Sequence, residues 1–374
     1  MADDALALGV RHATLNVLLG PLIEKAPLAD QPLSLREEAL VELDAQVRPL
    51  AQAGMVIYCI LLGRPTGDAR VDALLLDARG LAALDSPPEG YLAFRADESG
   101  AATLRGICRL LAERYARQGV RGWIVGNEVN SHHWWYGLGP ASCEEVAVAY
   151  ESAARAVWEG VHTADPHARV YLSLEHHWNI RYPAGTELQS CPGRELLMNI
   201  ASLARRRGDF PWHLAFHPYP EDLFDCRFWE DASARPDDDT PRITFRNLEV
   251  LERALGGKEL LWEGAPRRVI LSEQGFHCPE GAEGERLQAA AYAAAWRVVA
   301  RRPGIDAFIL HRHVDHAHEG GLRLGLWERT EGSVATPGRR RPIWELFRAV
   351  DGPEGSAAMR DALAAAGLPA ETGL

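Results

Sequence analysis

The sequence predicts an α/β protein that folds as a single-domain (β/α)8 TIM barrel, and two observations support this prediction. Short apolar, β-branched segments alternate with longer amphipathic segments along the 374 residues, as expected for repeated strand–helix units around a parallel sheet. Eight segments have the character of strands. That number favours a closed barrel over an open doubly wound sheet, which more often has about five or six strands.

The predicted elements follow one another in a regular order. Capping boxes formed by Ser34 with Glu37 and by Ser142 with Glu145 predict the starts of two helices. We expect residues 1–374 to form one catalytic domain, with residues 351–374 as a helical tail outside the barrel. The predicted strands, of which the third has the weakest pattern, are residues 13–19, 55–62, 91–94, 122–126, 170–174, 213–216, 268–272 and 307–310.

The composition limits the class of partner. The formal net charge of −12 argues against binding to nucleic acid, because that binding rests on clustered Lys and Arg. The six cysteines include no C-x-x-C pair of the kind used in zinc and redox sites. Without a signal-peptide pattern or a long apolar run, we expect no membrane contact and a cytoplasmic location, with a truncated secreted protein as the alternative. The oligomeric state stays open.

Two glutamates follow predicted strands at the positions where barrel enzymes carry their chemistry. Strand four ends Trp-Ile-Val-Gly-Asn-Glu-Val-Asn and places Glu128 at the rim, and strand seven ends Val-Ile-Leu-Ser-Glu and places Glu273 there. Two carboxyl groups flanking one bond are what glycoside hydrolysis requires. Because two like charges at short range do not both ionise cheaply, such a pair holds one proton and supplies an acid together with a nucleophile.

Four motifs carry a resemblance to known families, namely Gly-Asn-Glu-Val-Asn, Ala-Phe-His-Pro-Tyr-Pro, Leu-Ser-Glu-Gln-Gly-Phe and His-Arg-His-Val-Asp-His. The sequence resembles the clan of retaining (β/α)8-barrel glycoside hydrolases. Over nearly its whole length it is more closely similar to an uncharacterised bacterial barrel family, DUF5722. The resemblance implies cleavage of a β-type linkage with retention and without a cofactor, in an oligosaccharide, polysaccharide or simple glycoside.

The resemblance to the clan also implies roles for individual residues. Glu128 would be the general acid/base, Asn127 would bond the sugar 2-hydroxyl, and Glu273 would attack the anomeric carbon. His217 and Tyr219 are similar to the clan's groups that orient the nucleophile.

Further residues at the predicted strand ends suit a sugar ligand. Aromatic rings stack on the apolar faces of sugars, and amide and imidazole groups bond to hydroxyls. The clan usually carries a Trp after strand eight. This sequence has His311 and His313 there, and Trp327 is the substitute that it offers. The remaining residues that we expect to bind substrate are Asn16, Asn130, Trp134, Trp135, His176 and Trp178.

Histidines gather after strands four to eight, and they leave two alternatives open. His311, His313 and Asp315 alternate at strand spacing, so a metal-dependent hydrolase or lyase is one alternative, although no H-x-H pair lies on strand one. A non-catalytic carbohydrate-binding barrel is the other. In that case one glutamate would be a rim carboxylate paired with an arginine such as Arg181 or Arg312.

Overall fold

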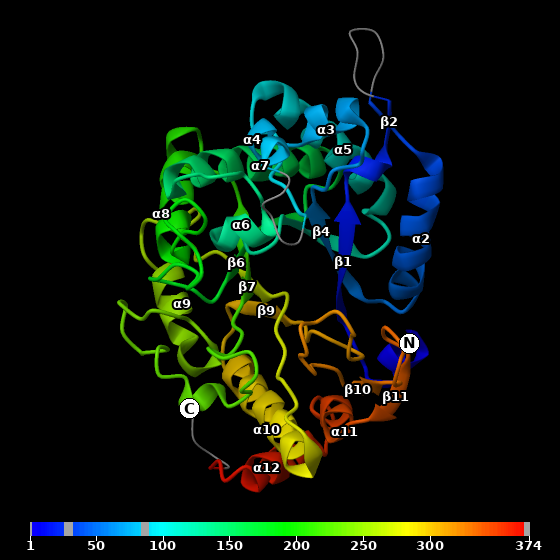
Figure 1. Cartoon of the computed structure of the whole chain (residues 1–374), viewed down its shortest axis with the longest axis vertical. Helices are drawn as coiled ribbons and strands as arrows, with labels where there is room; N and C mark the ends of the chain where they lie inside the picture. Colours follow the sequence, from blue (N-terminus) through cyan, green and yellow to red (C-terminus); the bar gives the residue numbers. More distant parts are fainter. Residues whose placement is uncertain (1, 26–32, 84–89, 370–374) are drawn as a thin grey trace. The chain divides into compact units, whose positions relative to one another are not determined.

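The computed structural model describes residues 2–25, 33–83 and 90–369 (Figure 1). The chain divides into two compact units. Unit 1 comprises residues 1–10, 216–254 and 270–374, and unit 2 comprises residues 11–215 and 255–269. Each unit is described by itself below, and the grouping of residues 1–374 into one domain stays a prediction.

Seven strands form one sheet, in the order β1-β4-β5-β6-β7-β8-β9. The pairs β1–β4, β4–β5 and β5–β6 are parallel, as repeated strand–helix units require. Strands β7 and β8 each belong partly to both units. The bounds are β1 (His12–Leu18), β4 (Val56–Leu62), β5 (Val120–Val125), β6 (Arg169–Glu175), β7 (Trp212–His217), β8 (Val269–Leu271) and β9 (Ile305–Phe308).

The third predicted strand, residues 91–94, is wrong. Leu92 makes only isolated bridges, to Gly63 and to Gly137, and Phe94 makes one to Leu76. The physical reason is that β4 and β5 pair directly with each other, so no strand fits between them. The other seven predicted strands are present, and the fold is an α/β fold with a parallel sheet. Closure into an eight-stranded barrel stays a prediction.

Helices of unit 2 pack against its sheet and against one another, with α5 beside α7 and α7 beside β5, β6 and α8. Helix α7 starts at the predicted capping box, in which Ser142 and Glu145 bond reciprocally. The predicted box at Ser34 is wrong, because Ser34 lies in β3 and its hydroxyl donates to Glu24 at 2.9 Å. The other elements of unit 2 are η1 (Gly20–Leu22), β2 (Ile23–Lys25), β3 (Ser34–Leu35), α2 (Glu37–Gln52), α3 (Ala69–Leu75), α4 (Ala78–Ala82), α5 (Glu98–Tyr115), η2 (Val129–Ser131), α6 (His132–Trp135), α7 (Cys143–Ala164) and α8 (Gly193–Arg206).

Unit 1 is built around the long helix α10, which packs against α11 and α12. Tyr292 of α10 stacks on Phe308 of β9 and on Phe347 of α11, so three elements share one aromatic cluster. Apart from strands of the seven-stranded sheet, the elements of unit 1 are α1 (Ala2–Ala7), η3 (Phe228–Glu230), η4 (Phe245–Asn247), α9 (Glu249–Leu255, whose last residue falls in unit 2), α10 (Gly281–Ala300), β10 (Trp327–Arg329), β11 (Pro337–Arg340), α11 (Pro342–Ala349) and α12 (Gly355–Ala365).

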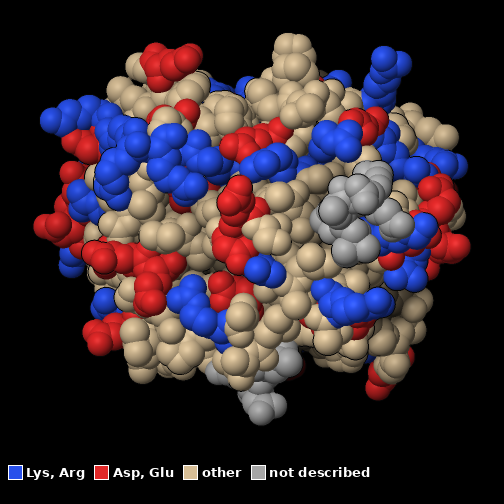
Figure 2. All heavy atoms as spheres, turned by 90° about the horizontal axis from the view of Figure 1, so that it is seen from above, with Lys and Arg blue, Asp and Glu red and all other residues tan. Residues whose placement is uncertain are grey.

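Charged side chains are spread over the surface of the chain (Figure 2). Acidic and basic side chains lie interleaved on the face that Figure 2 shows. Among the described residues, every helix is too short or too polar to span a bilayer. The six cysteines are free and buried.

Asp4 fastens the N-terminal helix α1 to the rest of unit 1. Its carboxylate accepts hydrogen bonds from the indole N–H groups of Trp327 and Trp344, at 2.8 and 3.0 Å, and pairs with His313 at 2.7 Å. Arg340 lies 3.3 Å away and stacks on both indoles. Although burial opposes the charge, these partners hold the pKa of Asp4 below its ordinary value. One carboxylate therefore satisfies four side chains that the chain places more than 300 residues later.

We expect Asp4→Ala to lower the free energy of unfolding by about 1–3 kcal/mol, because it leaves the buried indole N–H of Trp344 and three more exposed donors without this acceptor. Urea denaturation measures the change. Asp3→Ala is the matched control, since Asp3 is exposed one position away. Equal stability of the two variants would contradict the anchoring role.

Candidate active site

Glu128 lies on a tight turn directly after β5. Its backbone is left-handed, with φ 41° and ψ 50°, which is uncommon for any residue other than glycine. Gly126 also has a positive φ, of 67°, and a Cβ added there would lie 2.7 Å from the ring of Tyr136. The sequence Gly-Asn-Glu thus forms a turn that requires its glycine and directs the chain away from the strand at Glu128.

Hydrogen bonds from two other elements hold this turn. The backbone N–H of Glu128 donates to the hydroxyl of Ser173 on β6, at 2.9 Å. The N–H of Ser173 donates to the hydroxyl of Tyr150 on α7, which itself donates to the carbonyl of Val125, at 2.6 Å. Burial raises the pKa of Tyr150 well above its ordinary value, so the hydroxyl keeps the proton that it donates. The end of β5 is therefore fixed from both sides.

A second glutamate, Glu175, lies at the end of β6 within a buried network. Its Oε1 accepts hydrogen bonds from Asn130 at 2.6 Å and from Ser131 at 2.8 Å. Its Oε2 accepts from the backbone N–H of His177 at 3.0 Å and lies 2.6 Å from Nδ1 of the same residue, with Nε2 of His176 at 3.8 Å. Burial raises the pKa of Glu175, but the charge and hydrogen bonds of His177 outweigh it and lower that pKa below its ordinary value. The predicted ligands Asn130 and His176 belong to this network.

Aromatic rings lie next to the network around Glu175. The ring of Trp134 packs against Tyr182 at 4.3 Å between centroids, and His177 lies 5.3 Å from Tyr182. The pKa of Tyr182 is raised by its burial and by the negative charges of Glu128 and Glu175, so all these groups are neighbours. Trp134 is half-buried and keeps part of its ring open to a ligand.

Other predicted sugar-binding residues of unit 2 are placed in different ways. Trp135 is half-buried, and Asn16 is exposed on β1. Trp178 is only 1% exposed and offers no open ring face. Asn127 is half-buried, and its Oδ1 has no hydrogen-bond partner within the part of the chain that the structure describes. A buried amide oxygen without a partner is uncommon in folded proteins.

In unit 1, Glu273 follows β8 and lies near residues at and just after the end of β7. The hydroxyl of Tyr219 donates to Oε1 of Glu273 at 3.2 Å. His217, the last residue of β7, is buried and lies 2.9 Å from the hydroxyl of Ser272, the residue before Glu273. His217 and Tyr219 therefore contact the segment that contains Glu273, and their roles stay a prediction.

The two histidines after β9, His311 and His313, have different hydrogen-bond partners. His311 pairs with Glu319 at 2.9 Å. Burial lowers the pKa of His311, yet the negative charges of Glu273 and Glu319 outweigh burial and raise it. His313 pairs with Asp4, as does Trp327, and Asp315 pairs with Arg341 at 2.9 Å. The three residues proposed as a metal-ligand set have three separate partners in the described structure, so the metal alternative loses its basis there.

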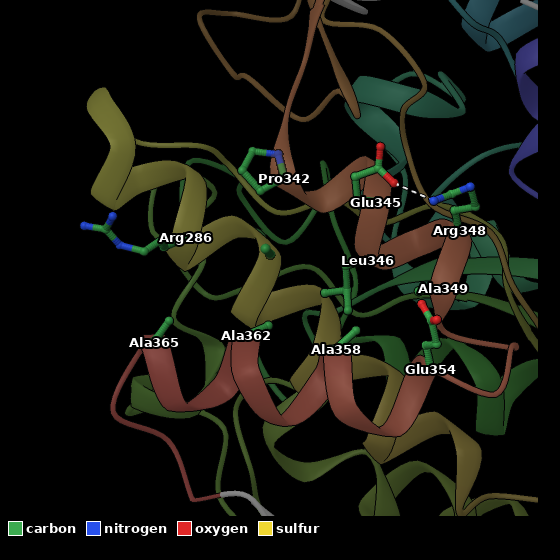
Figure 3. Close-up of a pocket in the computed structure, with 11 residues that line it drawn as sticks. Arg286, Pro342, Glu345, Leu346, Arg348, Ala349, Glu354, Ala358, Ala362 and Ala365 are labelled. Carbon is green, nitrogen blue, oxygen red and sulfur yellow. Dashed lines mark hydrogen bonds and ion pairs between the residues drawn. The ribbon is translucent and has the colours of Figure 1, made fainter.

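A cluster of possible metal ligands and a hollow between helices are two further candidate sites. Among the described residues, the donor atoms of Glu175, His176 and His177 converge as metal ligands do. A hollow of about 360 Å³ lies between α10, α11 and α12 (Figure 3). Five alanines line it, and Glu345 is paired with Arg348 at 2.9 Å. This hollow lacks the converging polar groups of an active site, whereas the strand ends carry them.

Comparison with known proteins identifies the family of the chain. The sequence profile described as "Family of unknown function (DUF5722)" matches residues 1–371. The chain belongs to this family. No curated protein matches the sequence of this DUF5722 member significantly.

Solved structures of glycoside hydrolases share the fold of the DUF5722 chain. A family 39 glycoside hydrolase from Bacteroides cellulosilyticus WH2 has a TM-score of 0.61 and 12% identity over 93% of this chain and 59% of that one. A β-glucosidase from Pyrococcus furiosus has a TM-score of 0.60 and 15% identity, covering 96% and 85%. A family 1 β-glucosidase from Thermotoga maritima has a TM-score of 0.55 and 10% identity, covering 93% and 84%. The chain thus spans about three fifths of the length of the family 39 enzyme.

Sequence reasoning missed several residues around the two glutamates of the DUF5722 chain. Glu175 directly follows the predicted strand at residues 170–174, so the rule that found Glu128 and Glu273 would have found it as well. Ser173 and Tyr182 carry no sequence signal, because a serine inside a strand and a tyrosine in a loop are common. Only their contacts with the turn at Glu128 and with Trp134 distinguish them.

The loop that follows β7 in the DUF5722 chain contains one strongly perturbed acid. Asp231 is 8% exposed, and its Oδ1 accepts the backbone N–H of Glu221 at 3.2 Å. Its Oδ2 has no hydrogen-bond partner within the described ranges. Burial raises the pKa of Asp231 to about 7. Because the folded state keeps a proton that the unfolded chain releases, this residue costs stability as the pH rises from about 4 to about 7.

We expect Asp231→Asn to gain stability relative to the wild type as the pH rises through that window, by an amount on the order of 2–4 kcal/mol. Thermal unfolding at pH 4 to 8 measures it, and the difference should level off above about pH 7. Asp237→Asn, an exposed change in the same loop, is the control and should show no such trend. A pH-independent difference for Asp231→Asn would contradict the buried, protonated state.

Proposed function

We propose that the chain is a glycoside hydrolase that cleaves a β-type glycosidic bond with retention, through a covalent glycosyl-enzyme intermediate. The observation that carries the proposal is the pair of strand-end glutamates. Glu128 follows β5 and Glu273 follows β8, three positions along one sheet, and each lies among groups suited to its role. The fold likeness to β-glucosidases and to a family 39 enzyme supports a glycoside as substrate. Closure of the sheet into a barrel is part of the same proposal.

The mechanism assigns a different task to each carboxyl group. Glu128 gives its proton to the leaving-group oxygen while Glu273 attacks the anomeric carbon, so that the glycosidic bond breaks as a bond to Glu273 forms. Glu128, now a carboxylate, then removes a proton from water. The resulting hydroxide displaces Glu273, which restores both groups.

Neighbouring side chains support these steps. Tyr219 donates to Oε1 of Glu273, which orients the carboxylate and stabilises its negative charge. By the resemblance to the clan, Asn127, the residue before Glu128, would bond the sugar 2-hydroxyl beside the reacting carbon. The half-open ring of Trp134, which lies on the side of the acid, would stack on the leaving group.

We expect Glu273→Ala to lower kcat by roughly three orders of magnitude or more on every glycoside, because no other group replaces the nucleophile. Glu128→Ala should keep much of its activity on aryl glycosides with acidic leaving groups, which need no proton, and lose it on alkyl glycosides. Steady-state kinetics on a matched pair of substrates measures both effects.

Glu331→Ala, an exposed carboxylate of unit 1, is the control and should behave as the wild type. Unchanged activity of Glu273→Ala, or equal losses on both substrate types for Glu128→Ala, would reject the assigned roles. In a crystal structure, a separation of about 5–5.5 Å between the two carboxyl groups supports retention, and roughly 6.5–9.5 Å supports inversion.

A further inference from the structure

We propose that Glu175, His176 and His177 form a binding site for a divalent transition-metal ion, with Zn²⁺ as the ion that their donors fit best. Each side chain offers one ligand atom, and the three atoms lie within 4.8 Å of one another. The side chains are 7%, 9% and 5% exposed. This site is independent of the hydrolase reaction, and it assigns His176 to an ion in place of the sugar.

The carboxylate of Glu175 is already oriented for such a role. Its Oε1 takes two donors from the turn after β5, the amide of Asn130 and the hydroxyl of Ser131. These bonds turn Oε2 toward the imidazoles, 2.6 Å from Nδ1 of His177 and 3.8 Å from Nε2 of His176. Hydrogen bonds of this kind fix ligand carboxylates in metalloproteins.

The donor set and its spacing select the ion. Two imidazole nitrogens and one carboxylate oxygen suit Zn²⁺ and its first-row neighbours, whereas Mg²⁺ and Ca²⁺ prefer oxygen ligands. With bonds of about 2.0–2.2 Å, the ligands of a tetrahedral zinc lie about 3.3–3.5 Å apart. The separations of 2.6 and 3.8 Å from Oε2 bracket this value, so small side-chain rotations suffice. The ion would take the place of the hydrogen bond between Oε2 and Nδ1.

An ion at this point would serve the fold. The ligands continue the chain from β6, and their supporting residues Asn130 and Ser131 belong to the turn after β5. The ion would hold these three side chains in one arrangement, and a ligand that binds only the folded state raises the unfolding temperature. The three side chains have low exposure, and a water would be the fourth ligand of a tetrahedral zinc.

The test uses the full chain, freed of metal with a chelator and dialysed against zinc. Mass spectrometry of the desalted protein should find one zinc per chain, and the unfolding temperature should rise with added zinc. The double variant His176→Ala, His177→Ala should bind no stoichiometric zinc, and added zinc should not raise its unfolding temperature. The matched control is His316→Ala, His318→Ala, whose two rings lie 5.3 Å apart on unit 1, and it should keep both.

Circular dichroism without metal shows whether each variant folds. If the double variant does not fold, the single change His176→Gln replaces it, since the Glu175–His177 bond remains. Loss of stoichiometric zinc in either folded variant supports the site. Wild-type protein without stoichiometric zinc, or a folded variant that retains it, overturns the proposal and leaves the hydrolase proposal untouched.

Discussion

The left-handed turn at Glu128 is the constraint on which the candidate site of unit 2 depends. A residue with a Cβ costs roughly 1–2 kcal/mol in this conformation. A buried backbone N–H without an acceptor would add about 1–3 kcal/mol. The hydroxyl of Ser173 removes the second cost, and Tyr150 fixes Ser173 in turn. Strain at one residue is thus maintained by contacts from a neighbouring strand and a helix, as is common at functional sites.

The same logic explains why so many polar side chains lie at the strand ends. A buried carboxylate such as Glu175 is stable only when its oxygens are satisfied, and four donors from three residues satisfy them. Because two of these donors, on Asn130 and Ser131, come from the turn after β5, the network sets the position of that turn relative to β6. The hydrogen bonds that satisfy the carboxylate of Glu175 also position the turn after β5. The apolar core beneath the strand ends does not provide this positioning.

The sequence predicted the strands well because a buried parallel strand is an almost continuous apolar run, as in Val-Ile-Tyr-Cys-Ile-Leu-Leu of β4. It failed at residues 91–94, where Leu92 and Phe94 are buried in the same way but pair outside the sheet. Apolar pattern reports burial, and it does not report which neighbour supplies the hydrogen bonds.

A site residue could be predicted from the sequence where its position relative to a strand could be predicted. The motifs of Tyr219 and Glu273 could be assigned because each lies just beyond a strand, and the structure joins them. The partnership of His313 and Trp327 with Asp4 was out of reach, since it joins residues more than 300 positions apart without a local pattern.

The contrast between the surroundings of the two candidate glutamates gives the assignment of roles its physical content. Glu273 receives a hydroxyl donor from Tyr219 and lies near His311, whose pKa its charge helps to raise. These groups hold the carboxylate of Glu273 in one orientation, as a nucleophile requires. Glu128 is half-buried and has the ring of Tyr182 near it. An aromatic ring beside the acid offers a surface on which a leaving group can stack.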